Sequence, residues 1–252
     1  MCGIVGFTSP GHDPAAAKRT VRAMADLIRH RGPDGEGYFA DARAALGHRR
    51  LAIIDPDGGA QPMFNEDATL AVVFNGEIYN YQALRAELQA LGHTFATDSD
   101  TEVLLHGYEA WGAVLPRHLR GMFAFAIWDS AAGRLFCARD LFGIKPLCYY
   151  RCSGTLLFAS ESKAFLAHPA FEKRLNEAAL ADWLSIEYLP GTETMFAGVY
   201  ELPPAHTLTW KDGKLTIERY ESLRFVPCHG RSLRAWAGEI GTALAESAAA
   251  HS

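Results

Sequence analysis

The 252-residue sequence lacks the features that define several large classes of protein. It has no apolar run approaching the roughly 20 residues that cross a bilayer, and no basic flank and apolar run of a secretory signal at its N-terminus. Basic residues are not in excess, since 24 Lys and Arg stand against 29 Asp and Glu, so no broad surface attracts nucleic acid or an anionic membrane. We therefore expect a soluble, cytoplasmic protein that binds neither nucleic acid nor membrane.

The cysteines and histidines form no obvious metal-binding or disulfide pattern. The five cysteines are scattered without a Cys-x-x-Cys pair, and the ten histidines include no metalloprotease-type helix motif. Structural zinc sites usually show paired ligands at short spacing, so we expect no metal site. A glycine-rich phosphate loop ending in Gly-Lys-Ser or Gly-Lys-Thr is also missing, which excludes another common enzyme signature.

The composition is that of an ordinary globular protein. Apolar residues make up 49% of the chain and charged residues 21%, which argues against general disorder. A chain of 252 residues can bury a large core, and its length suits one large domain, or one domain with part of a second. Because prolines punctuate the chain after residue 190, we divide it into a core at 1–190, a terminal hairpin and linker at 191–229, and the start of a further domain at 230–252.

Strand-like runs outnumber helical ones along the chain. Strands are expected at 2–7, 36–40, 44–55 with a break, 70–74, 122–129, 134–138, 147–150, 156–159, 208–210 and 215–217, and helices from residues 14 and 233 and at 81–91 and 101–111. Because the strands are not regularly interleaved with helices, the pattern favours an α+β layered fold over a doubly wound parallel sheet. The run 122–128 is apolar on both faces, which indicates two stacked sheets covered by helices.

Cys2 is a candidate N-terminal nucleophile. A methionine before a small residue is readily removed by aminopeptidase, and removal of Met1 would leave one residue with both a thiol and a free α-amine. The α-amine has a pKa of about 7.7–8.0, so its neutral fraction near pH 7 can act as the base for the thiol, whose thiolate form is the nucleophile. The alternative role for Cys2 is that of a small apolar residue in a buried strand.

Several ordered motifs together resemble one family. They are MCGIVGF at 1–7, HRGPDGEG at 30–37, GHRRLAIID at 47–55, FNGEIYNY at 74–81, SDTEVLLHGYEAWG at 99–112, GMFAFAIWD at 121–129 and RDLFGIKPL at 139–147. In this order they resemble class II glutamine amidotransferases, and most of all the glutaminase domain of glutamine-hydrolysing asparagine synthetases. Relatives that aminate sugar phosphates or phosphoribosyl pyrophosphate share the MCGI start but usually lack NGEIYNY and LAIID in these forms.

The resemblance implies both a fold and a reaction. The implied fold is the four-layer αββα sandwich of N-terminal nucleophile hydrolases, which agrees with the two stacked sheets inferred above, and residues 1–190 would form its glutaminase core. The implied reaction is hydrolysis of L-glutamine to L-glutamate and ammonia through a γ-glutamyl thioester on Cys2, with its α-amine shuttling the proton. No cofactor or metal is implied for this step.

The resemblance also assigns an oxyanion hole. Asn75 and Gly76 match the family residues that bind the oxyanion of the tetrahedral intermediate, through a side-chain amide and a backbone N–H. A residue without a side chain lets the backbone approach the substrate closely. Taken alone, Asn75-Gly76 is a typical hairpin turn.

The remaining implied residues bind the glutamine substrate. Arg50 matches the arginine that holds the α-carboxylate, for which a planar guanidinium is well suited. Glu77 and Asp100 match the carboxylates that bind the α-ammonium group, and the backbone at Leu51 and Ile53 would line the pocket. Two of these residues also have a structural alternative: Arg50 as a solvated strand residue and Asp100 as the N-cap of the helix at 101–111.

One part of the family pattern is missing. Asparagine synthetases continue into an ATP-dependent domain that adenylates aspartate, and its loop, Ser-Gly-Gly-x-Asp-Ser, does not occur in this sequence. We therefore expect ATP and Mg²⁺ only in a synthetase domain or chain that would receive the ammonia. A fragment of a longer synthetase is favoured over a chain that works beside a separate synthetase.

Two alternatives to asparagine synthesis stay open. The chain fits the glutaminase half of a paralogous amidotransferase with another acceptor, such as a sugar or a natural-product carboxylate. It also fits a non-catalytic docking module, although the intact set of site residues argues against this. The sequence is compatible with a homodimer and does not specify one.

Overall fold

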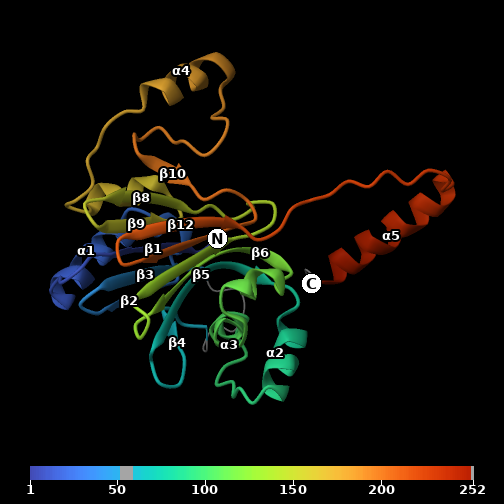
Figure 1. Cartoon of the computed structure of the whole chain (residues 1–252), viewed down its shortest axis with the longest axis horizontal. Helices are drawn as coiled ribbons and strands as arrows, with labels where there is room; N and C mark the ends of the chain where they lie inside the picture. Colours follow the sequence, from blue (N-terminus) through green and yellow to red (C-terminus); the bar gives the residue numbers. More distant parts are fainter. Residues whose placement is uncertain (52–58, 251–252) are drawn as a thin grey trace.

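The computed structural model describes residues 1–51 and 59–250. Two six-stranded sheets stack face to face and carry helices on their outer faces (Figure 1). The strand pairs in both sheets are antiparallel. Within the described residues, each helix is too short or too polar to span a bilayer.

The first sheet has the N-terminal strand near its centre. Its strand order is β10 (Val199–Glu201), β8 (Cys148–Cys152), β9 (Thr155–Ala159), β1 (Gly3–Thr8), β3 (Ala44–Arg50) and β2 (Gly35–Ala40). The register pairs Gly3 with Arg49 across β1 and β3. Cys2, which directly precedes β1, therefore lies beside the end of β3 at Arg50.

The second sheet includes a short strand that begins at Met63. Its strand order is β12 (Lys214–Arg219), β11 (His206–Lys211), β7 (Arg134–Arg139), β6 (Gly121–Asp129), β5 (Leu70–Ile78) and β4 (Met63–Phe64). The expected hairpin near residue 212 is confirmed as β11 and β12, and β10 joins the first sheet. The strands within residues 199–219 thus form one edge of each sheet. The division of the chain at 190 and 229 stays a prediction.

Helices cover the outer face of each sheet. Helix α1 (Pro14–Asp26) and the 3₁₀ turn η3 (Ser162–Ala167) contribute to the cluster on the first sheet. Helices α2 (Tyr81–Ala90) and α3 (Glu102–Trp111), with the 3₁₀ turn η2 (Gly112–Arg117), contribute to the cluster on the second. The layers are therefore helix, sheet, sheet and helix, which confirms the expected four-layer αββα sandwich.

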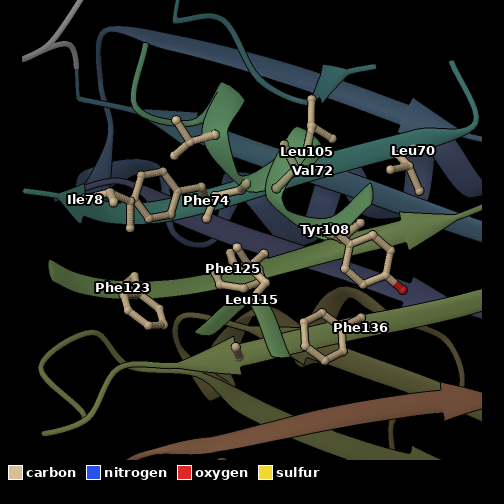
Figure 2. Packing of buried hydrophobic residues seen from close by; sticks show 14 of the residues in the cluster. Leu70, Val72, Phe74, Ile78, Leu105, Tyr108, Leu115, Phe123, Phe125 and Phe136 are labelled. Carbon is tan, nitrogen blue, oxygen red and sulfur yellow. The ribbon is translucent and has the colours of Figure 1, made fainter. Parts of the chain in front are cut away.

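Side chains alternate between the two faces of each strand, and this alternation divides the core into three apolar layers, one between the sheets and one under the helices on each side. Ile4 in β1 and Val73 in β5 face the gap between the sheets, whereas their neighbours face the helices. Figure 2 shows the cluster on the helix-facing side of the second sheet, which includes Phe74 of β5, Phe125 of β6 and Leu105 of α3. Phe125 is fully buried, so an alanine there would cost about 3–5 kcal/mol of folding free energy. Burial on both faces explains the nearly continuous apolar runs in the sequence.

Two local predictions were wrong. Asn75 and Gly76 are not a turn: they lie inside β5 and pair with Ala124 and Phe123 of β6. Pairing along the whole of β6 overrides the local turn preference of the dipeptide. Asp100 is not the N-cap of α3, because the helix begins at Glu102 after Thr101.

Two helices lie in the C-terminal third of the chain. Helix α4 (Glu177–Ile186) was not predicted, although Asn176 caps it by accepting from the N–H of Ala179 at 3.3 Å. Helix α5 (Leu233–Ala250) confirms the predicted helix after Ser232, and it lies apart from the sandwich (Figure 1). Its apolar stripe, Leu233, Trp236, Ile240 and Leu244, is exposed.

Candidate active site

A cavity of about 180 Å³ opens where β1 begins, β3 ends and β5 passes beneath the start of α3. The structure brings together seven of the eight predicted site residues in its lining: Cys2, Arg50, Leu51, Asn75, Gly76, Glu77 and Asp100. The eighth, Ile53, lies outside the described residues. The cavity is smaller than the roughly 300–1,000 Å³ of sites for drug-sized ligands, so it suits a small metabolite.

The thiol of Cys2 is held by the backbone of one residue. The N–H of Leu51 donates to Sγ at 3.4 Å, and Sγ lies 3.6 Å from the carbonyl oxygen of Leu51. The carbonyl of Cys2 accepts from Nε of Arg31 at 3.0 Å. These contacts position Sγ at the cavity wall, beside Arg50.

Arg31 is itself anchored by an ion-pair cluster. Its Nη1 donates to Oε1 of Glu161 at 2.8 Å, and the same oxygen lies 2.9 Å from Nε2 of His30. Partial burial opposes ionisation of Glu161, but hydrogen bonds from Arg31, Lys163 and His30 outweigh it and lower the pKa of this carboxyl to about 2. Glu161 is therefore ionised at neutral pH, and it orients the arginine that holds the N-terminal backbone.

Asn75 lines the cavity and has an unused side-chain hydrogen-bond donor. Its side chain is buried, with 1% of the residue exposed, and its Nδ2 has no hydrogen-bond partner among the described residues. A buried donor without a partner costs about 1–3 kcal/mol of desolvation free energy. Such a donor, placed in the lining that includes Cys2, is available to an oxygen of a bound substrate.

Gly76 follows directly, and its position excludes any side chain. A Cβ at residue 76 would lie 2.2 Å from the carbonyl oxygen of Met122 and 2.8 Å from Cα of Phe123. Both are backbone atoms of β6 and have little freedom to move. The close approach of β5 to β6 therefore requires glycine at this position.

The backbone before Asn75 is fixed from two sides. Nε2 of His48 lies 3.1 Å from the carbonyl oxygen of Phe74, and Oε1 of Gln61 accepts from the N–H of Phe74 at 2.6 Å. Burial lowers the pKa of His48 to about 4, so its ring is neutral and Nε2–H donates to the carbonyl. His48 thereby ties β3 of one sheet to β5 of the other beside the cavity.

Charges of both signs line the cavity. Arg50 and Lys145 are basic, whereas Glu77 and Asp100 are acidic. Burial lowers the pKa of Lys145, and the nearby carboxylate of Asp140 opposes this effect. Such a balance suits a ligand that carries one carboxylate and one ammonium group.

The surroundings of Asp100 raise the pKa of its carboxyl group. Burial raises the pKa of Asp100 to about 6, even though its Oδ2 accepts from the N–H of Ile78 at 3.0 Å, and the neighbouring carboxylate of Glu77 raises it further. An ammonium group between Glu77 and Asp100 would relieve both effects.

The sequence did not single out several polar residues that also line the cavity. Lys145 lies in RDLFGIKPL, so that motif was the available signal for it. Gln61 and Thr101 are joined by a bond of 3.3 Å from Nε2 to Oγ1, and no motif marked Gln61. His48 lies in GHRRLAIID, so that motif was the available signal for it.

Comparison with known proteins identifies the family. A family model described as a glutamine amidotransferase domain matches residues 1–221, which is most of the chain. The chain belongs to this family. The predicted resemblance is thereby confirmed.

Curated relatives of this amidotransferase domain include asparagine synthetases. The chain is 42% identical to asparagine synthetase [glutamine-hydrolyzing] 3 of Bacillus subtilis (strain 168), over 87% of this chain and 36% of the relative. It is 37% identical to a putative asparagine synthetase [glutamine-hydrolyzing] of Mycobacterium tuberculosis, over 100% of this chain and 42% of the relative. The chain thus spans well under half the length of these relatives.

Solved structures share the fold of the amidotransferase domain. Glutamine phosphoribosylpyrophosphate amidotransferase from B. subtilis matches with a TM-score of 0.64 and 21% identity, over 87% of this chain and 49% of that one. An allosteric regulatory enzyme of purine biosynthesis matches with a TM-score of 0.66, 23% identity and the same coverage. These matches bear on the fold, and they support the N-terminal nucleophile hydrolase architecture.

Proposed function

We propose that this domain hydrolyses L-glutamine and supplies the ammonia to a synthetase. The observation that carries the proposal is the pairing, in one small cavity, of the Cys2 thiol with the unpartnered Nδ2 donor of Asn75. Amide hydrolysis by covalent catalysis needs a nucleophile beside donors that stabilise an oxyanion.

The charged lining supports glutamine as the substrate. Arg50, Glu77 and Asp100 all line the cavity. In this proposal Arg50 binds the α-carboxylate, and Glu77 with Asp100 bind the α-ammonium group. The side-chain amide then reaches toward Sγ of Cys2. Because glutamine is a zwitterion, the two charged ends fix its orientation, so that the reacting carbonyl lies near the nucleophile.

The proposed reaction has two steps. After removal of Met1, the free α-amine of Cys2 takes the thiol proton, and Sγ attacks the amide carbon of glutamine. The oxyanion is bound by Nδ2 of Asn75 and the N–H of Gly76, and collapse of the intermediate releases ammonia, whose extra proton comes from the α-ammonium group. Water then attacks the γ-glutamyl thioester with the α-amine as base, which releases glutamate and restores the thiol.

The acceptor of the ammonia is proposed from the relatives. Their names describe glutamine-hydrolyzing asparagine synthetases, so we take aspartate as the acceptor, activated with ATP and Mg²⁺ in a synthetase domain or chain. Hydrolysis itself is assigned to groups of this chain and uses neither. The five free cysteines suit the reducing cytoplasm, where we place the reaction.

The proposal is tested by intact mass spectrometry before and after treatment with a glutamine analogue whose amide is replaced by an electrophilic ketone. Glutamate release from glutamine is measured in parallel. Burial raises the pKa of Cys148 to about 12 and also raises the pKa of Cys137, so these thiols should resist alkylation.

We expect loss of Met1, one adduct located on Cys2 by peptide mapping, and glutamate production. Competition by L-glutamine and not by D-glutamine would support the charged subsites. A correctly processed protein with neither adduct nor glutamate would overturn glutaminase activity for this chain. If glutamine did not slow formation of the adduct on Cys2, glutamine would be overturned as the substrate.

A further inference from the structure

Three side chains outside the cavity place potential metal ligands together. The ligand atoms of His93, His106 and Glu109 all lie within 4.8 Å of one another. Oε2 of Glu109 is 3.0 Å from Nδ1 of His106 and 3.3 Å from Nδ1 of His93. We infer that this cluster binds one divalent transition-metal ion of the Zn²⁺ type. This inference is independent of glutamine hydrolysis.

The local sequence explains how the three residues meet. Helix α2 ends through Gly92, whose φ of +99° lets the N–H of His93 bond back to the carbonyl oxygen of Leu88 at 3.1 Å. His106 and Glu109 are three residues apart on α3 and therefore share one face of that helix. Packing of α2 against α3 brings His93 to this face.

The hydrogen bonds of His106 point to a missing ligand. Its side chain is only 1% exposed, and it has a carboxylate near each ring nitrogen: Glu109 at Nδ1, and Glu102 with Oε1 at 3.6 Å from Nε2. Nε2 itself has no hydrogen-bond partner within residues 1–51 and 59–250. A neutral imidazole carries one N–H, so it leaves one of these carboxylates facing a lone pair unless a cation, either a second proton or a metal ion, binds the ring.

A metal ion on Nδ1 removes this conflict. Metal-bound histidine keeps its proton on the other nitrogen, and Nε2–H of His106 would then be directed at Glu102. A carboxylate in this outer position is the usual partner of a metal-bound histidine. Glu102 is already fixed, because its oxygens accept from the N–H groups of Ala96 at 2.7 Å and Thr97 at 2.8 Å.

Glu109, the third ligand, is also oriented by a residue outside the cluster. Oε1 of Glu109, the oxygen that does not face the histidines, accepts from Nδ2 of Asn65 at 2.8 Å. This bond fixes the carboxylate so that Oε2 points between His93 and His106. Glu109 and the carboxylate of Glu102 behind His106 are therefore both held by hydrogen bonds before any ion binds.

The donor set and the spacing select the class of ion. Two imidazole nitrogens and one carboxylate oxygen suit Zn²⁺, and hard cations such as Mg²⁺ prefer oxygen ligands. Ligands about 2.0–2.1 Å from Zn²⁺ lie about 3.3 Å apart in a tetrahedron. Two of the three separations, 3.0 and 3.3 Å, are close to this value, and all three are within 4.8 Å. The side chains of His93 and Glu109 are 21% and 26% exposed, so a water molecule can complete the site.

The ion would connect the end of α2 to α3. The segment between them contains Ser99, Asp100 and Thr101, which line the glutamine cavity, although the cluster itself does not. We assign the ion a structural role, in which it holds this segment. The absence of a metal site was expected from the sequence, because these ligands are spaced 13 and 3 residues apart and form no short paired motif.

The test is a titration of the untagged, chelator-treated full chain with Zn²⁺, followed by calorimetry and by thermal unfolding. It is done in a Cys2→Ala background, because a processed N-terminal cysteine offers its own thiol and amine to zinc. The test variants are His93→Gln and Glu109→Gln, both at partly exposed positions. His229→Gln is the matched control, because His229 is exposed, follows the exposed Cys228 in the sequence and is outside the cluster.

We expect one Zn²⁺ per chain, a higher unfolding temperature with zinc, and affinity at least about tenfold weaker in both test variants but unchanged in the control. Circular dichroism checks that the variants are folded. Absence of saturable binding, or equal affinity in the control background and both test variants, would overturn the inference. The three residues would then be a histidine pair bridged by a carboxylate.

Discussion

The thiol of Cys2 and the backbone of Leu51 contact each other twice, with Sγ 3.4 Å from the amide nitrogen and 3.6 Å from the carbonyl oxygen. Leu51 follows the end of β3, so the strand that carries Arg50 also positions the nucleophile. Because these contacts use the backbone, they do not depend on which side chain occupies position 51. The relationship explains how a residue ahead of the first strand is held in a defined place.

Cys2→Ser should remove glutamine hydrolysis, with a loss on the order of 10⁴-fold or more in kcat, because a hydroxyl is a much weaker nucleophile than a thiolate. The fold should be unchanged, since the substitution alters one partly buried atom. Glutamate release and circular dichroism are the measurements. Cys228→Ser, at an exposed thiol, is the control and should keep full activity. Turnover by correctly processed Cys2→Ser at the rate of the control would refute the nucleophile assignment.

Asn75→Ala should lower kcat by about 10²–10³-fold with little loss of stability. Its Nδ2 has no partner in the described part of the chain, so removing the donor relieves a desolvation cost. Steady-state kinetics and thermal unfolding check both parts. Asn176→Ala is the opposite case: it removes the cap of α4, should cost about 1 kcal/mol, and should leave kcat unchanged. Normal kcat in Asn75→Ala would exclude an oxyanion role.

Gly76→Ala should reduce both stability and activity. The new Cβ would meet backbone of β6 at 2.2 Å, and the strand shift needed to accommodate it should cost about 1–3 kcal/mol and displace the N–H of residue 76. Gly238→Ala is the matched control, because that glycine lies in α5 with nothing near its Cβ position, and alanine there should stabilise the helix. Denaturant unfolding compares the two variants. If the two variants were equally stable, contact of the new Cβ with β6 would not determine the stability of Gly76→Ala.

The layered fold could be predicted because burial on both faces leaves a strong sequence pattern. The run that became β6 is apolar at consecutive positions, and this alone indicated a strand between two apolar layers. The same reasoning failed at Asn75 and Gly76, where local turn preference suggested the end of a strand. Pairing with β6 determines their conformation, and this long-range contact is invisible to a local pattern.

The residues of the site could be predicted from the sequence only in part. The resemblance selected residues from four separate segments, and the structure places the described ones in one cavity. It could not select Gln61, which matters through its bond to the N–H of Phe74, since no pattern of residue types marks such a contact. The cluster of His93, His106 and Glu109 was missed for a similar reason: the helix end that places His93 acts through backbone geometry.

Glutamine binding should weaken as the pH falls below about 6. The pKa of Asp100 is raised by burial to about 6, so below this pH the carboxyl becomes neutral and loses its attraction for the α-ammonium group. The dissociation constant of glutamine is best measured by calorimetry in Cys2→Ala, which cannot turn the ligand over. In Cys2→Ala with Asp100→Asn, binding should be weaker at pH 8, and the fall in affinity between pH 7 and 5 should be smaller.

Stability should change with pH in the opposite sense. A carboxyl whose pKa is raised from 3.8 to about 6 on folding binds its proton more tightly in the folded state, so it favours folding at pH below 4, and this contribution is lost as the pH rises through about 6. Asp100→Asn carries no charge to bury, and its amide oxygen can still accept from the N–H of Ile78. The variant should therefore be more stable than the parent at pH 8, and the difference should vanish near pH 4. Denaturant unfolding of ligand-free protein at both pH values measures this difference, and a pH-independent difference would show that burial of the charge does not control the titration of Asp100.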